Sequence, residues 1–190
     1  MDSRTVRDLY RRIIASCSIG VVLFHCLLAV QSVAADLKSD QEYQIKAAFV
    51  YNFAKFVEWP AASFKDTQTP LAICILGNDP LKGSLDNLKD KRIEGRPVLV
   101  RKITTVEHSD ECHMLFIPMA QKDNLLHILK AVQNRSILTV SDTKGFSNSG
   151  VMINLILIDN RIGFEINQAT AGRASLRISS QLLKLAKIVK

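Results

Sequence analysis

Runs of apolar residues alternate with amphipathic segments through the middle of the chain. Leu71–Leu76 is a continuous apolar run, typical of a strand that is covered on both faces. Pro97–Ile103, His113–Pro118 and Ile137–Asp142 also have strand patterns, and Gln121–Gln133 has the pattern of an amphipathic helix. Strands that alternate with helices indicate a parallel sheet with right-handed crossovers.

A crossover helix is predicted directly after the first of these strands. Asp79 can cap a helix that begins at Pro80, because proline is favoured at the first helical position. Leu81, Leu85 and Leu88 then follow at helical spacing. This helix would connect two neighbouring parallel strands.

The last third of the chain breaks the alternation. Val151–Ile158 and Arg161–Ile166 both have strand patterns and flank Asp159 and Asn160, so we expect a tight antiparallel hairpin. The predicted fold is therefore α/β: a mixed, mainly parallel central sheet flanked by helices, ending in the antiparallel hairpin and C-terminal helices.

Two short helices are expected after the hairpin. Asn167 can cap a helix that extends through Arg173, and Ser179 or Ser180 can cap a final helix. The apolar face of that final helix comprises Leu182, Leu185, Ala186 and Val189.

The segment Asp40–Trp59 has the pattern of a helix that Pro60 ends, because a residue before proline is driven out of the α region. Apolar positions cover more than half of its circumference: Ile45, Phe49, Val50, Phe53, Phe56 and Val57. We assign the phenylalanines to the core. Tyr51 on the polar side and Trp59 at the exit fit that role less well, so two interpretations stay open for them, core packing and a partner-binding interface.

The N-terminal segment has the pattern of a secretory signal peptide. Arginines precede a long apolar run, and Val33 and Ala35 are small residues of the kind that a signal peptidase requires. We predict a signal peptide over residues 1–35 and a single domain over residues 36–190. An uncleaved membrane anchor is the alternative, because the apolar run approaches the length of a bilayer span. The small residues at the expected signal-peptidase site favour cleavage.

Composition and charge narrow the choice of partners. The chain has 190 residues, 47% of them hydrophobic and 23% charged, a balance that suits one globular domain. Its net charge is +7, and because the first 35 residues hold four arginines and two aspartates, +5 remains after them. These positive charges are scattered, without interleaved aromatic residues. The pattern argues against nucleic-acid binding and favours an anionic neighbour such as a membrane surface.

Two cysteines, Cys74 and Cys112, remain after the predicted signal peptide. In an oxidising compartment two thiols favour one disulfide bond. A zinc site is the alternative, with His113 beside Cys112, but no further ligand has helical or knuckle spacing. We therefore favour the disulfide and expect no metal site.

Common catalytic and nucleotide-binding motifs are absent from the sequence. It contains no GxGxxG, GxxxxGK[ST], GxSxG or HExxH motif, and His108, His113 and His127 lie in no pattern that marks a catalytic base. Ser141 and Asp142 follow a predicted strand, where open α/β sheets bind ligands, although a simple turn has the same sequence. We predict no catalytic residue and no cofactor.

Glu165, Asn167 and Arg173 form a polar group at the end of the predicted hairpin. Glu165 and Arg173 can form an internal ion pair that joins the hairpin to the short helix. They can equally present a charged rim to a partner or a ligand. The internal pair is the favoured interpretation, and the binding role stays open.

Several specific segments occur together along the chain. Besides the export signal and Cys74, they are KAAFVYNFAKFVEWP at residues 46–60, ECHMLFI at 111–117, GVMINLILIDNRIGFEIN at 150–167 and SSQLLKLAKIV at 179–189. In this combination, essentially the whole mature chain resembles the YfiR-like family of bacterial periplasmic proteins.

The resemblance implies a small periplasmic α/β domain that is usually dimeric and has no known catalytic activity. The best-known members of the family repress a membrane-bound diguanylate cyclase from the periplasmic side and release it under envelope or redox stress, so that cyclic di-GMP rises. Cys74 and Cys112 look like the family's disulfide bridge. Some members carry a second bridge in the region of Ser147 to Met152, where this chain has no cysteine. We therefore expect the bridge to support stability more than redox sensing.

Three classes of function follow from these observations. The leading one is a non-enzymatic regulator that binds the periplasmic domain of a membrane-bound diguanylate cyclase or a similar receptor, with Tyr51 and Trp59 as candidate contacts. The alternative is a periplasmic sensor that binds a small ligand through Glu165 and Arg173. An enzyme is the least favoured class, because no nucleophile, base and orienting group occur together.

Overall fold

The computed structural model describes residues 40–78, 81, 83–159 and 161–189. The predicted signal peptide over residues 1–35 lies outside these residues, as do the predicted helix cap Asp79 and first helical residue Pro80. The chain divides into two units, Met1–Glu42 and Tyr43–Lys190, and the sheet belongs to the second.

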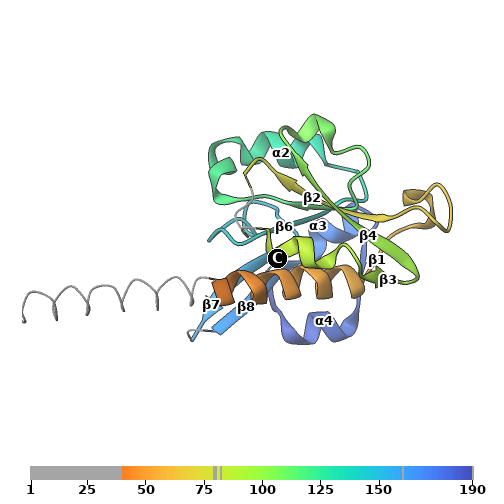
Figure 1. Ribbon diagram of the computed structural model, residues 1–190. Helices are drawn as coiled ribbons and strands as arrows, with labels where there is room; N and C mark the ends of the chain where they lie inside the picture. The colour runs from red at the N-terminus through yellow and green to blue at the C-terminus, as the bar shows by residue number, and fades with distance from the viewer. Residues whose placement is uncertain (1–39, 79–80, 82, 160, 190) are drawn as a thin grey trace, which may run out of the picture. The chain divides into compact units, whose positions relative to one another are not determined.

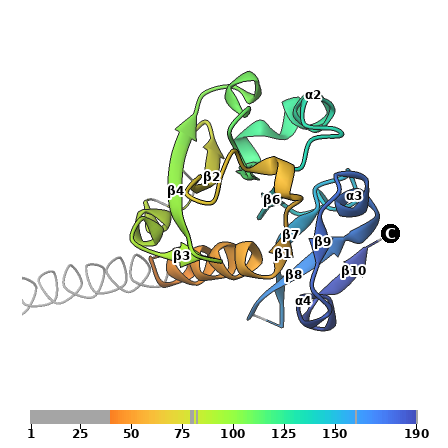
Figure 2. The same ribbon diagram turned by 90° about the vertical axis from the view of Figure 1, so that its right-hand side faces the viewer.

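A mixed sheet is the central feature of the second unit (Figures 1 and 2). Within the described residues it has eight strands in the order β10-β8-β7-β6-β5-β2-β4-β3. The parallel part comprises β4 (Arg96–Ile103), β2 (Leu71–Leu76), β5 (Met114–Phe116), β6 (Leu138–Ser141) and β7 (Ile153–Ile158). The predicted α/β fold with a mainly parallel mixed sheet is confirmed.

The remaining strands lie toward the two edges of the sheet. At one edge, β3 (Arg92–Ile93) pairs antiparallel with β4. At the other, β8 (Arg161–Asn167) pairs antiparallel with β7, and β10 (Lys187–Val189) pairs parallel with β8. The hairpin predicted around Asp159 is confirmed, since Ile158 lies opposite Arg161.

The central strands divide their side chains between two apolar clusters, one on each face of the sheet. Leu71, Ile73 and Ile75 of β2 belong to the first core, and Cys74 and Leu76 to the second. The helix of residues 40–55 packs against the first core, and α2 (Leu125–Ala131) packs against the second (Figure 2). Because strand side chains alternate between faces, a strand covered on both sides must be apolar throughout.

The helix of residues 40–55 is shorter than predicted. We expected it to continue to Trp59, but Val57–Glu58 form β1, which pairs antiparallel with β9 (Arg177–Ile178). The backbone groups of Val57 and Glu58 therefore bond to a distant strand instead of to the preceding helical turn. The placement of Ile45 on the apolar face was also wrong, because 48% of this residue is exposed.

Aromatic contacts join this helix to the hairpin. The ring of Phe53, which is fully buried, lies 5.0 Å from the ring of Phe164 in β8 and 5.9 Å from that of Phe49, between ring centroids. Phe49 and Phe164 are 5.8 Å apart. Edge-to-face and tilted pairs at such distances stabilise beyond the area that they bury. The predicted core role of these phenylalanines is consistent with this arrangement.

The other helices differ from the predicted ones in length and type. Gln121–Gln133 was predicted as one helix, but the 3₁₀ helix η4 (Met119–Asn124) precedes the short α2. Leu81, Leu85 and Leu88 are buried as expected, although the local helix is the 3₁₀ helix η2 (Ser84–Leu88). Two further 3₁₀ turns are η1 (Ala61–Ser63) and η3 (Val106–His108).

The C-terminal segment confirms the predicted caps but not the long final helix. The Asn167 side chain accepts a hydrogen bond from the Thr170 amide at the start of α3 (Gln168–Arg173). Ser179 caps α4 (Ser180–Leu185) in the same way. After α4 the chain turns into β10, so the apolar face predicted to continue through Val189 is wrong, and Leu185 is 76% exposed.

A disulfide joins Cys74 of β2 to Cys112, two residues before β5, as predicted. The Cα atoms are 5.8 Å apart, and both residues are buried in the second core. Because β2 and β5 are paired neighbours in the sheet, the bond fixes the two central strands covalently.

We predict that Phe53→Ala lowers the free energy of unfolding by about 3–5 kcal/mol, because it leaves a cavity between the helix and β8. Denaturant titration measures the change. Asn52→Ala, an exposed substitution in the same helix, is the control and should change stability by less than about 0.5 kcal/mol. Equal effects of the two substitutions would show that Phe53 does not anchor the helix.

Replacing both cysteines by serine should lower the free energy of unfolding by about 2–4 kcal/mol, because the bond closes a long loop in the unfolded chain. The sequence separation of the two residues is 38. Urea unfolding of the double variant measures this loss. Thiol alkylation of the unreduced wild-type protein under denaturing conditions is the companion measurement, and two reactive thiols would contradict the bridge.

Candidate functional site

Tyr51 lies half-buried on the helix of residues 40–55, at the margin of the first core. Its hydroxyl donates a hydrogen bond of 3.3 Å to the carbonyl oxygen of Arg92 in β3, and the Lys55 ammonium lies 5.6 Å from its ring centroid. The side chain therefore has a structural contact with the sheet edge and a face that is still accessible. This geometry is compatible with both interpretations of Tyr51.

Trp59 is also half-buried and packs against the first core. Its indole N–H donates to the carbonyl oxygen of His113 at 3.0 Å, which ties the segment after β1 to the start of β5. Trp59 is thus held in one orientation by a hydrogen bond within its own chain. A side chain that is already ordered loses little entropy when a partner binds to it.

His113 holds the segment between η1 and β2. Its Nδ1 atom accepts from the Ala72 amide at 3.1 Å, and its Nε2 atom donates to the carbonyl oxygen of Ser63 at 3.0 Å. The Phe64 ring stacks on the imidazole, with centroids 4.4 Å apart, and the Arg96 guanidinium covers the other side of Phe64 at 3.8 Å. These contacts require the neutral imidazole, because a protonated ring cannot accept from Ala72.

Burial lowers the pKa of His113 below its ordinary value of 6.5. The positive charge of Arg96 acts in the same direction, and the hydrogen bond to Ser63 opposes it. The sequence indicated only a packing or surface histidine here. The structure shows that this residue is a structural one with three separate contacts.

The carboxylate of Glu165 bonds within the protein, but not to Arg173 as the favoured interpretation predicted. It accepts a hydrogen bond from the Ser147 hydroxyl at 2.5 Å and lies 3.7 Å from the Lys187 ammonium. Lys187 is placed there by the pairing of β10 with β8, in register with Glu165. The predicted internal pair therefore has a different cation, because β10 replaced the end of the predicted final helix.

Asn167 has two structural roles and is buried. Its side-chain oxygen caps α3, and its Nδ2 group donates to the Ser147 carbonyl oxygen at 3.1 Å. Asn167 and Glu165 together hold the segment between β6 and β7 through Ser147. Neither side chain is well placed to contact a partner directly.

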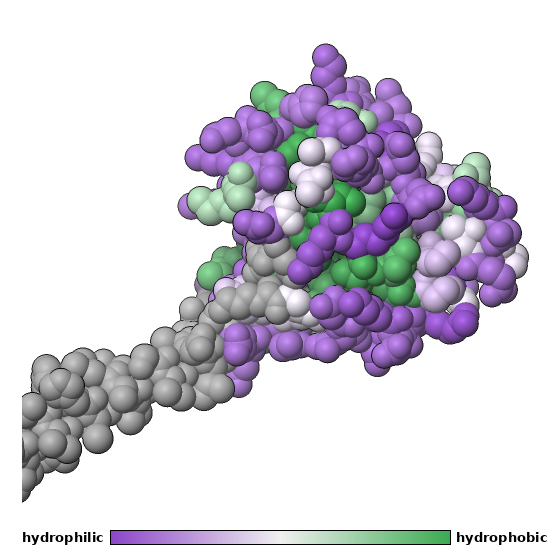
Figure 3. All heavy atoms as spheres, turned by 45° about the horizontal axis from the view of Figure 1, so that its top comes forward, coloured by the Kyte–Doolittle hydropathy of each residue, from purple (hydrophilic) through white to green (hydrophobic). Residues whose placement is uncertain are grey.

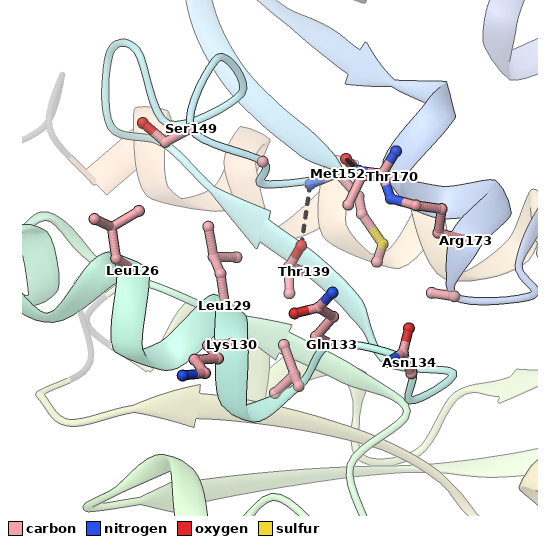
Figure 4. Close-up of a pocket in the computed structure, with 13 residues that line it drawn as sticks. Leu126, Leu129, Lys130, Gln133, Asn134, Thr139, Ser149, Met152, Thr170 and Arg173 are labelled. Atoms are coloured by element: carbon pink, nitrogen blue, oxygen red, sulfur yellow. Dashed lines mark hydrogen bonds between the residues drawn. The ribbon is translucent and has the colours of Figure 1, made fainter.

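Arg173 is the exposed member of this group. Its Nη2 atom donates to the Thr170 hydroxyl at 2.8 Å, within α3. It lines a groove of about 360 Å³ between α2 and α3, with Thr139 and Met152 between the two helices (Figure 4). The three residues predicted as one polar group are thus neighbours along the chain, but only Arg173 reaches this groove.

Ser141 and Asp142, which follow β6, have internal partners. The Asp142 carboxylate lies 2.9 Å from the Lys46 ammonium, and both side chains are mostly buried. The Ser141 hydroxyl accepts from the Thr143 amide at 3.1 Å. This ion pair joins the helix of residues 40–55 to the carboxyl end of β6, so the simple structural interpretation of these two residues is sufficient.

The groove contains residues that sequence reasoning did not identify. Lys130 comes from α2, Gln133 from the turn after it, Thr139 from β6, and Met152 from the segment before β7. The Met152 amide donates to the Thr139 hydroxyl oxygen at 3.0 Å (Figure 4). No local motif relates these positions, because the topology of the sheet brings them together.

The described part of the chain has no group of three or more histidine, cysteine, aspartate or glutamate residues that could hold a metal ion. It also has no helix that is both long and apolar enough to cross a bilayer.

A model of the YfiR/HmsC-like family matches residues 43–187, which is most of the chain. The chain belongs to the YfiR/HmsC-like family. Membership supports the role of a periplasmic regulator in general, and the family is regulatory rather than catalytic. The resemblance found in the sequence is thereby confirmed.

No curated protein matches this YfiR/HmsC-like chain. Among solved structures, it is similar to a conserved domain protein from Vibrio cholerae O1 biovar El Tor strain N16961, with 10% sequence identity and a TM-score of 0.49. The similarity covers 63% of this chain and 54% of the Vibrio cholerae chain.

We predict that stability falls as the pH is lowered from about 7 to about 5, because the unfolded His113 binds a proton near pH 6.5 while the folded residue resists it. A depressed pKa means that this stabilisation is complete above the unfolded pKa. It is lost as the pH falls toward the folded pKa. Urea midpoints across this range measure the slope.

Substitution of His113 by glutamine separates this effect from those of other titrating groups. His113→Gln should be less stable at neutral pH and show a flatter pH dependence than the wild type. His108→Gln, at an exposed position, is the matched control and should keep the wild-type slope. An unchanged slope in His113→Gln would assign the pH dependence to other groups.

Proposed function

We propose that the mature chain is a non-enzymatic periplasmic regulator that represses a membrane-bound diguanylate cyclase by direct protein contact. The family match over residues 43–187 is the observation that carries this proposal. Repression through the periplasmic domain of the cyclase would lower cyclic di-GMP on the cytoplasmic side of the membrane. Release of the regulator would raise it.

Export through a cleaved signal peptide is part of the proposal. The N-terminal sequence supports export, because arginines, an apolar run and small residues at the cleavage position follow one another. The disulfide between Cys74 and Cys112 supports the same compartment, since such bonds persist in the oxidising periplasm.

Tyr51 and Trp59 are our candidates for contact with the cyclase. Each is a half-exposed aromatic residue that a hydrogen bond to a backbone carbonyl holds in one orientation. Rigid aromatic side chains often contribute most of the binding energy in protein interfaces. Arg173 is the candidate on α3, because its guanidinium is exposed while Glu165 and Asn167 serve the fold.

The surface has the general character of a binding surface. Figure 3 shows a mostly hydrophilic face on which hydrophobic residues gather in a hollow. Interfaces typically combine an apolar centre with a polar rim.

We further propose a homodimer, as the resemblance implies. Leu157 and Leu185 are exposed apolar side chains that a second copy could cover.

Tyr51→Ala should leave the melting temperature nearly unchanged and raise cyclic di-GMP in cells that contain the cyclase. The substitution removes an aromatic contact while the buried Val50 and Phe53 stay in place. Tyr51→Phe is the matched variant, since it keeps the ring and removes only the hydrogen bond to Arg92. We expect it to repress normally.

If Tyr51→Ala lowers repression only as much as it lowers the amount of folded protein, that result would assign Tyr51 to the core alone. Arg173→Ala then tests the second candidate surface with the same two measurements, melting temperature and cyclic di-GMP.

Co-purification of the mature protein with the membrane cyclase tests the proposed function itself. If the cyclase is absent from such complexes and its activity does not depend on the protein, the proposed function is wrong.

A further inference from the structure

The groove between α2 and α3 has an apolar interior and a polar rim. Leu129, Val132, Met152 and Ala174 supply apolar surface, and the rim carries the side chains of Lys130, Gln133, Asn134, Thr170 and Arg173. Its volume of about 360 Å³ is within the range of small-molecule sites, which are mostly apolar with a few directed polar groups.

The charge of this groove distinguishes it from the other hollows of the described surface. Lys130 and Arg173 both line it, and none of its described lining residues is acidic. The hollows around His113 contain Asp110 and Glu111, and a further hollow near β4 contains Glu107 with the same two carboxylates. The groove therefore favours an anion, and the other hollows do not.

Thr139 provides a second observation inside the groove. The residue is fully buried, and its hydroxyl oxygen accepts a hydrogen bond from the Met152 amide. This hydrogen bond fixes the backbone of Met152, so this wall of the groove is ordered before a ligand binds.

We propose that this groove binds a small organic anion with an apolar body. The acidic group, a carboxylate or a sulfonate, lies between Arg173 and Lys130 and accepts charge-assisted hydrogen bonds from them. The apolar body contacts Leu129 and Met152. This site does not include Tyr51 or Trp59, but it shares Arg173 with the second candidate surface for the cyclase. The proposal goes beyond protein-mediated repression.

The charges of Lys130 and Arg173 determine the selectivity of the site. Both residues line the groove, Lys130 from α2 and Arg173 from α3. Figure 4 shows the ammonium of the exposed Lys130 turned away from Arg173, so this side chain changes rotamer to reach an anion bound at Arg173. A neutral analogue of the same shape buries the same apolar surface but loses both charge-assisted interactions. A cationic analogue is repelled by both side chains.

The test uses naphthalene-1-sulfonate as the probe, with the neutral analogue 1-naphthalenemethanol and the cationic analogue 1-naphthylmethylammonium for comparison. Calorimetric titration of the mature protein should show binding of the sulfonate and much weaker binding of both analogues. Arg173→Met and Lys130→Met should each weaken sulfonate binding about tenfold, which is the effect of one charge-assisted hydrogen bond. Lys184→Met, an exposed charge removal on α4, should leave it unchanged.

Amide chemical shifts locate the probe independently. The sulfonate should shift the amide signals of Thr139, Met152 and Ala174, and Arg173→Met should reduce these shifts without lowering the melting temperature. Equal affinity for the neutral analogue, or equal weakening by Lys184→Met, would overturn the proposal. It would also be overturned if millimolar sulfonate gave no binding or shifted only residues outside the groove.

Discussion

The structure depends on two central strands that are apolar on both faces. β2 and β5 lie side by side in the sheet, and each sends alternate side chains into the first and the second core. Neither face can be left to solvent, because exposed apolar strands would lose the burial that stabilises the fold. The helix of residues 40–55 must therefore cover one face and α2 the other, and the disulfide fixes the two strands between them.

This constraint determines where polar groups remain available for function. Several polar side chains below the covering elements have partners within the protein: Glu165 and Asn167 hold Ser147, and Asp142 pairs with Lys46. His113 is likewise occupied by Ser63 and Ala72. Side chains at the margins keep accessible surface, which is why Tyr51, Trp59 and Arg173 are the residues that we assign to binding.

The local features of the fold could be predicted from the sequence, while its long-range pairings could not. Leu71–Leu76 was predicted to the residue, since an uninterrupted apolar run between turn residues has few alternatives. The end of the first helix was not, because only pairing with Ile178 makes Val57 a strand residue. The partner of Glu165 was missed for the same reason, since Lys187 reaches it through β10. No sequence motif predicted the groove, because α2 and α3, which form its two sides, are far apart in the sequence.

We propose that this family member represses a membrane cyclase through direct contact by its half-exposed aromatic residues. Photo-crosslinking in intact cells tests it most directly, with p-benzoylphenylalanine in place of Tyr51 and, as the control, in place of the exposed Lys122 of η4. We expect a covalent adduct between position 51 and the periplasmic domain of a diguanylate cyclase, and none from position 122. Equal adducts from both positions, or none from position 51 in cells where the cyclase is repressed, would contradict it.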